Sequence, residues 1–371
     1  MALPAEISNL IFDECISDKA LLATWGLVSK NHLVASRFHL FSAVRLDNLN
    51  AHGFAEILDA PSCDISHLLQ RLTLSSRSLG RASEWSWFPY VVPRLPAFPN
   101  LTTLCLHNSK FVLTEDARIH LHSILPAVTT LEIVNFPFAY PMAAIEFACG
   151  FPALEALTFF PKPSLPTLAL GSGSGPQARM PGSLRTLALR CSVDEQPNWL
   201  LVALGQAHAP ALTSLRVREA GARDFPVLAR ALARQGASLE SLALDFADTI
   251  VEVAFLRNYL LEGNRSLRRL ELALGSNEMV ELCVLVLSHI TSPVLQEVVF
   301  DIWIDPKKFR RHPWERLDAA IVQGPSAMRS VELRVGTLIR WAPLARAIRK
   351  RMSMCDELGI LRIRIDDEDE C

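Results

Sequence analysis

The sequence predicts an α/β solenoid, a stack of short repeats with parallel strands on one face and helices on the other. Three observations support this fold class. An apolar–x–x–apolar–x–apolar hexad recurs at intervals of 26 to 33 residues, apolar stripes with helical spacing lie between hexads, and a proline lies two or three residues before most hexads. Repeats of this length bury their apolar faces only against their neighbours, so they build elongated stacks that bind other molecules.

Eleven hexads mark the predicted strands. Successive side chains of a strand point to opposite faces, so the apolar positions share the core face and the residue between them faces the other way. The hexads span Leu69–Leu74, Leu101–Leu106, Val128–Ile133, Leu154–Phe159, Leu184–Leu189, Leu212–Val217, Leu239–Leu244, Leu267–Leu272, Leu295–Phe300, Met328–Leu333 and Leu358–Ile363.

Helices are predicted between hexads. Glycines and prolines that end these helices lie at similar positions in successive repeats. Apolar stripes of helical spacing begin at Phe225, Met279 and Trp341. Gly236 and Gly263 mark helix exits in two repeats. Proline biases its predecessor away from helical angles, so it ends a helix and starts an extended segment. Prolines of this kind precede seven hexads, at Pro99, Pro126, Pro152, Pro181, Pro210, Pro293 and Pro325.

The first 46 residues do not follow the repeat. Pro4 opens a helical stripe that contains Ile7 and Ile11, and Asp18 is suited to cap a second short helix. Leu27-Val28-Ser29-Lys30 leads into a third helix. Three short helices make a poor independent core, so this segment is expected to lean on a partner or on the first repeat.

Composition excludes several classes of function. The net charge of −2 does not favour a nucleic-acid or membrane binder. The eight cysteines include no CxxC pair, and the histidines show no ligand spacing, so we expect no metal and no cofactor. Cys105, inside a hexad, is interpreted as a small hydrophobe of the apolar face. Free thiols and the lack of a secretory signal favour the cytoplasm or nucleus.

Both parts of the chain resemble known families. The hexads over 69–363 resemble the leucine-rich repeat family, and the N-terminal segment resembles an F-box in its Leu3-Pro4-x-Glu6-Ile7, Ile11, Leu27–Lys30 and Ser36–Phe41 elements. The combination resembles F-box/leucine-rich-repeat proteins. The resemblance implies a three-helix F-box at 1–46, a solenoid of about eleven repeats at 47–365, with its sheet on the concave face, and an acidic tail at 366–371.

The resemblance also implies a function, that of a substrate-recognition subunit of a Skp–cullin–F-box ubiquitin ligase. The F-box would bind the Skp-type adaptor and, through it, a cullin, while the solenoid would bind a target protein. The alternative that some F-box residues only fill a small helical core stays open. The residues expected to contact the adaptor are Leu3, Pro4, Ile7, Ile11, Leu27 and Val28.

Three arginines form the candidate target-binding patch. Arg190, Arg216 and Arg218 belong to neighbouring predicted strands, which lie ~5 Å apart. Such a patch suits an acidic or phosphorylated peptide, because arginine binds carboxylate and phosphate through two parallel hydrogen bonds. The alternative interpretation is simple pairing with Asp245 and Glu271 on the same surface.

An enzymatic function is not expected. The sequence lacks the HExxH, GxSxG, phosphate-loop and GxGxxG motifs in a suitable context. The alternative to a ligase subunit is a non-catalytic leucine-rich-repeat scaffold whose F-box-like segment does not engage a ubiquitin ligase.

Overall fold

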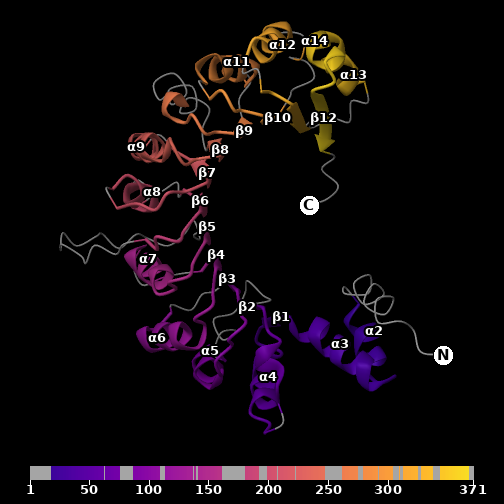
Figure 1. Cartoon of the computed structure of the whole chain (residues 1–371), viewed down its shortest axis with the longest axis vertical. Coiled ribbons are helices and arrows are strands. Elements are labelled where there is room, and N and C mark those ends of the chain that lie inside the picture. The colour runs from indigo at the N-terminus through magenta and orange to yellow at the C-terminus, as the bar shows by residue number, and fades with distance from the viewer. Residues whose placement is uncertain are drawn as a thin grey trace. The chain divides into compact units, whose positions relative to one another are not determined.

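The chain divides into two compact units, Met1–Ser183 and Leu184–Cys371. Each unit is a parallel sheet whose strands follow the chain order, with helices between successive strands (Figure 1). The predicted α/β class with parallel strands is therefore confirmed. The computed structural model describes residues 18–61, 63–75, 87–108, 113–136, 138, 141–160, 180–191, 199–206, 208–221, 223–246, 261–274, 279–290, 292–303, 309, 312–324, 327–336 and 343–366.

The first unit begins with two helices and continues as a repeat sheet. In Figure 1, helices α4 to α7 follow one side of the strands. The strands are β1 (Ala43–Leu46), β2 (Arg71–Ser75), β3 (Thr103–His107), β4 (Thr130–Val134) and β5 (Ala156–Phe160). The helices are α2 (Lys19–Gly26), α3 (Lys30–Phe41), α4 (Ala51–Leu58), η1 (Ile65–His67), α5 (Phe88–Val91), η3 (Val92–Arg94), α6 (Glu115–Ile124) and α7 (Pro141–Cys149).

The second unit repeats the same strand-and-helix alternation. Its strands are β6 (Thr186–Arg190), β7 (Ser214–Ala220), β8 (Ser241–Phe246), β9 (Arg269–Leu274), β10 (Glu297–Trp303), β11 (Ser330–Gly336) and β12 (Leu361–Asp366). Its helices are α8 (Trp199–Leu204), α9 (Phe225–Gln235), η4 (Leu261–Gly263), α11 (Met279–His289), α12 (Trp314–Val322), α13 (Leu344–Arg351) and α14 (Ser353–Glu357). Helices α9 and α11 confirm the first two apolar stripes as helical, and α13 confirms the third from Leu344 onwards, while Trp341 lies outside the described residues.

The hexads set the register of the sheet. Leu104 of β3 pairs with Leu72 on one side and Leu131 on the other, and Leu131 pairs with Leu157. All four leucines are buried, so the fourth hexad position forms a continuous apolar row beneath the sheet. Burial of each such side chain stabilises the fold by roughly 2 kcal/mol. Because the row is shared between neighbours, no single repeat can form it alone.

The sheet starts earlier than the hexads. Strand β1 pairs in parallel with β2, with Val44 opposite Leu72, although no hexad precedes it. It lies inside the segment 1–46 assigned to the N-terminal module, so the last residues of that segment are part of the sheet. The division between the two units falls at Ser183, inside the region predicted as one continuous stack.

Polar side chains satisfy the turns between repeats. Gln235, at the end of α9, is buried and reaches back to the preceding turn. Its Oε1 accepts a hydrogen bond from the Leu212 amide, and its Nε2 donates to the Pro210 carbonyl, both at 2.8 Å. Ser266, directly before a hexad, donates to the Ala237 carbonyl in a similar way. These bonds pair backbone groups that would otherwise lose hydrogen bonds on burial.

Gly236 follows α9 as predicted, but the reason for the glycine differs from the expected one. Its φ of −52° is right-handed, so no left-handed cap is formed. Instead, a Cβ at this position would lie 2.4 Å from the carbonyl oxygen of Gly263. Gly236 is therefore required by the close approach of two backbone segments.

Candidate functional site

The N-terminal helices present one of the two candidate binding sites. Asp18 caps α2 by accepting a hydrogen bond from the Leu21 amide, as predicted, and Ser29 caps α3 by accepting from the His32 amide. Leu27 and Val28 connect the end of α2 to the Ser29 cap of α3. Their exposed fractions are 86% and 67%, so neither fills the helical core. Their contact with an adaptor stays a prediction. Leu3, Pro4, Ile7 and Ile11 lie outside the described residues.

Further apolar side chains are exposed on the same two helices. The sequence interpretation missed them as surface residues because apolar residues at helical spacing are usually core. Leu33 and Val34 are adjacent in sequence and lie about 100° apart around the helix axis, so packing on one side of α3 cannot bury both, and this is the signal that was available. We call the set the N-terminal apolar surface, comprising Leu21, Leu27, Val28, Leu33, Val34 and Phe38, all of which are exposed.

The second candidate site lies on the face of the second unit's sheet opposite the buried leucines. We call it the open face of this unit. Its central row runs across the strands in register as Ala188, Arg216, Ala243, Glu271, Val299, Glu332 and Arg362. The structure places all three predicted arginines here, because Arg190 pairs with Arg218 and Arg216 lies two residues before Arg218 on the same strand.

Glu271 is the centre of the charged groups on this face. It lies 3.5 Å from Arg216, 3.5 Å from Arg269 and 3.3 Å from Arg334. The small side chain of Ala243, between Arg216 and Glu271 in the row, leaves space for this arginine to reach across a strand. The predicted basic patch is therefore a mixed network in which acidic groups balance arginines. Arg216, with 44% of its side chain exposed, remains accessible to a ligand.

A bulge in β7 adds a second acidic group. Between Val217 and Ala220 the register shifts, so that Arg218 and Glu219 together face the single residue Asp245. Glu219 has a positive φ of 55°, and its carboxylate lies 3.3 Å from the Arg190 guanidinium. No motif in the sequence marks this bulge. It explains why Arg190 pairs within the sheet rather than standing alone beside Arg218.

The bulge affects the ionisation of Asp245, which lies opposite it. Burial raises the pKa of its carboxyl above the ordinary value, and Glu219 raises it further, while Arg218 acts in the opposite direction. An acid whose pKa is raised by folding destabilises the folded chain once the carboxyl is ionised.

We expect Asp245→Asn to stabilise the protein more at neutral pH than in acid. Below the ordinary aspartate pKa, the carboxyl is protonated in both folded and unfolded chains, and the shift contributes nothing. As the pH rises past that value and then past the raised pKa, the wild type loses stability that the asparagine variant keeps. Urea unfolding across this pH range measures the difference. The control is Glu240→Gln, in an exposed pair with Arg268. A stabilisation by Asp245→Asn that does not change with pH would contradict the prediction.

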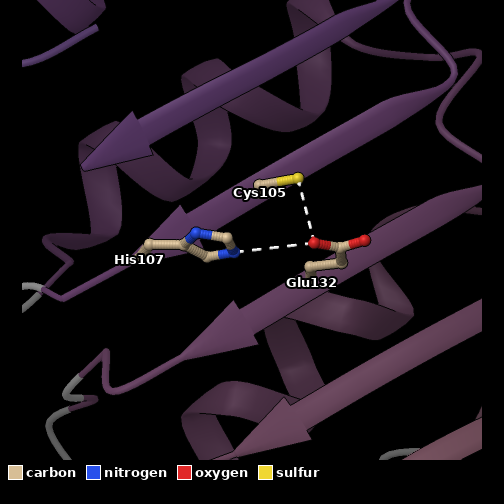
Figure 2. A group of neighbouring side chains, drawn as sticks. All are labelled: Cys105, His107 and Glu132. Atoms are coloured by element: carbon tan, nitrogen blue, oxygen red, sulfur yellow. Dashed lines mark hydrogen bonds and ion pairs between the residues drawn. The ribbon is translucent and has the colours of Figure 1, made fainter. Parts of the chain in front are cut away.

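The open face of the first unit contains a different cluster, which sequence interpretation missed. The prediction that Cys105 joins the apolar face is wrong. Its side chain lies on the opposite side of the sheet from Leu104 and Leu106, between Thr73 and Glu132. His107, two residues further along β3, shares this side. Figure 2 shows the thiol and the imidazole both directed toward the Glu132 carboxylate. The distances to Glu132 Oε2 are 3.3 Å from Cys105 Sγ and 3.6 Å from His107 Nε2.

Burial dominates the electrostatics of this cluster. It raises the pKa of the Cys105 thiol to about 12, with Glu132 adding to the effect. Burial also lowers the pKa of His107, more than the neighbouring carboxylate raises it. The His107 Nε2 atom is itself buried and makes no hydrogen bond, since 3.6 Å exceeds hydrogen-bond distance. The signal in the sequence was the C-x-H spacing on a strand, which places both side chains on one face.

Comparison with known proteins adds no family assignment. A search against protein-family models finds no match, and neither does a search of curated proteins. Among the helices within the described ranges, none has the length and apolar character needed to cross a membrane.

Proposed function

We propose that this protein is the substrate-recognition subunit of a Skp–cullin–F-box ubiquitin ligase in the cytoplasm or nucleus. The N-terminal module would bind the Skp-type adaptor, and the repeat sheet would bind a target protein. The observation that carries the proposal is the exposure of Leu27 and Val28 between two capped helices, followed directly by a parallel repeat sheet. That the partner is a Skp-type adaptor is inferred from the resemblance of the N-terminal residues to an F-box.

The exposed apolar residues support an adaptor interface on physical grounds. Isolated exposed apolar side chains are common, but two short helices in contact that expose six of them present more apolar surface than scattered exposure would give, which supports a protein interface. Burial of a leucine such as Leu27 against a partner would contribute roughly 2 kcal/mol. Leu3, Pro4, Ile7 and Ile11 belong to the same proposed interface by resemblance.

In this proposal the chain contributes no catalytic group. The adaptor and cullin would bring the ubiquitin-loaded conjugating enzyme, and the repeat sheet would hold the target close to it. Holding an acceptor lysine near the thioester raises its effective concentration, which is sufficient to accelerate transfer. The expected chemistry is therefore positioning alone.

For the target, the proposal is an acidic or phosphorylated peptide that binds Arg216 on the open face of the second unit. Because Arg216 is 3.5 Å from Glu271, an incoming carboxylate or phosphate would compete with an existing contact. Exposed ion pairs are worth at most about 1 kcal/mol, so a doubly charged phosphate that binds the guanidinium through two hydrogen bonds can displace it. Arg190 and Arg218 would add positive potential beside it.

The decisive experiment is co-purification of the full chain with a Skp-type adaptor. The variant Leu27→Asp/Val28→Asp is expected to lose adaptor binding by about 100-fold or more, because two charges would be buried without partners. The matched control is Leu49→Asp, a leucine 72% exposed in the same unit but outside the two helices, which should bind normally. Arg216→Gln should also keep the adaptor while it lowers capture of an acidic phosphopeptide.

A wild-type chain that does not bind any Skp-type adaptor would favour the second function, a non-catalytic scaffold. The network around Glu271 supports binding of a partner in both cases. The two functions are separated by ubiquitin transfer to the captured target in the presence of adaptor, cullin and RING subunit. Transfer that is lost in Leu27→Asp/Val28→Asp but kept in Leu49→Asp supports the ligase subunit.

A further inference from the structure

We propose that Cys105, His107 and Glu132 form a zinc site on the open face of the first unit, with water as the fourth ligand. The three side chains offer a sulfur, an imidazole nitrogen and a carboxylate oxygen, all within 4.8 Å of one another. These are the donor types that bind Zn²⁺ in proteins, and three protein ligands with one open position are typical of sites that keep a water. The proposal does not depend on the adaptor or on the target.

The two distances to the Glu132 carboxylate suit tetrahedral zinc. With Zn–S of ~2.3 Å and Zn–N and Zn–O of ~2.0 Å, the edges of the tetrahedron are ~3.5 Å for sulfur to oxygen and ~3.3 Å for nitrogen to oxygen. In the structure, Cys105 Sγ lies 3.3 Å and His107 Nε2 lies 3.6 Å from Glu132 Oε2. A metal would therefore fit with movements of a few tenths of an ångström at these two contacts.

The sheet itself fixes the three donors. Cys105 and Glu132 are register partners on adjacent strands, and His107 is the next residue on the same side of β3 (Figure 2). Ligands on strands of a packed sheet are held more precisely than ligands on loops. His107 Nε2 is buried without a hydrogen bond, and a metal would give this nitrogen a partner.

Charge balance favours a divalent cation with affinity for sulfur. A thiolate and a carboxylate carry two negative charges, which Zn²⁺ neutralises. The proton of the Cys105 thiol, now 3.3 Å from Glu132, would pass to solvent when the metal binds. Two arginines nearby, Arg45 and Arg71, oppose cation binding, and Arg45 donates a hydrogen bond to Ser75 at 2.7 Å. A sulfur ligand favours zinc over magnesium and calcium, which prefer oxygen.

The test is a cobalt titration of the chelator-treated full chain. Co²⁺ occupies zinc sites and reports them by visible bands of tetrahedral geometry and by a near-ultraviolet band from thiolate ligation. We expect one equivalent of Co²⁺ to produce both bands and Zn²⁺ to displace it. Cys105→Ser should abolish the thiolate band, and His107→Gln and Glu132→Gln should each weaken Zn²⁺ binding by about 100-fold.

The matched control is Cys191→Ser. Cys191 is also a buried thiol that hydrogen-bonds a carboxylate, Asp224, but it belongs to no metal-binding group of three among the described residues. This variant should keep both cobalt bands. If Cys105→Ser does not fold, His107 and Glu132, whose side chains are 29% and 30% exposed, decide the outcome. A titration without a thiolate band, or bands that survive His107→Gln and Glu132→Gln, would overturn the proposal.

Discussion

Gly236→Ala is expected to destabilise the protein by about 3 kcal/mol, because overpacking against a rigid partner costs 1–3 kcal/mol or more. The added methyl group would lie 2.4 Å from the carbonyl oxygen and 2.8 Å from the carbonyl carbon of Gly263. Both atoms belong to backbone, so no side-chain rotation relieves the overlap. The turn after α9 and the η4 segment must instead move apart. Urea unfolding followed by circular dichroism measures the loss.

Gly53→Ala is the control for this substitution. Gly53 lies in helix α4, and a Cβ there would meet nothing within 4 Å. The same chemical change should therefore be neutral or should stabilise the protein by up to about 1 kcal/mol, because alanine favours helix more than glycine does. Equal effects at the two positions would show that the close approach of Gly236 to Gly263 is not rigid.

Asp318→Ala is the second large effect that we expect, a loss of about 3 kcal/mol from two charge-assisted hydrogen bonds. Asp318 lies on α12 and is buried, and its two carboxylate oxygens accept from the Met354 and Cys355 amides, each at 2.9 Å. These are donors of the first turn of α14, whose own N-cap residue, Met352, has no oxygen that could accept them. Alanine would leave the Cys355 amide unpaired in the interior and the Met354 amide unpaired at a partly buried position.

Hydrogen exchange of the Met354 and Cys355 amides, together with the free energy of unfolding, tests this prediction. The control is Glu315→Ala on the same helix, because Glu315 is exposed and pairs only at the surface with Arg351. Loss of that pair should cost less than 1 kcal/mol. If both variants lose the same stability, Asp318 is not the cap of α14.

The strands could be predicted because the hexads repeat the same three apolar positions. Each described strand from β2 onwards starts inside its hexad, as Leu104 and Leu131 illustrate. Strand β1 could not be predicted in this way. It has only four residues, and a short segment such as Ala43–Leu46 forms a strand because β2 offers it a parallel edge.

The sites were predictable only in part, because they depend on pairs of residues distant in sequence. The arginines were placed on the correct face by alternation along the strand, yet their pairing depends on Glu271, which lies 55 positions after Arg216. Glu219 entered the network through a bulge that no residue pattern indicates. The interpretation of Cys105 failed because a hexad's middle position was treated as apolar, although alternation places it opposite its neighbours.

The N-terminal apolar surface has a consequence for the life of the protein in the cell. A leucine with 86% of its surface in water is an attachment point for chaperones and for degradation machinery as long as nothing covers it. Under the proposed function, a freshly synthesised copy would be protected only once an adaptor is bound, and its steady-state abundance would follow the supply of adaptor. Surplus copies would be removed without any dedicated regulator.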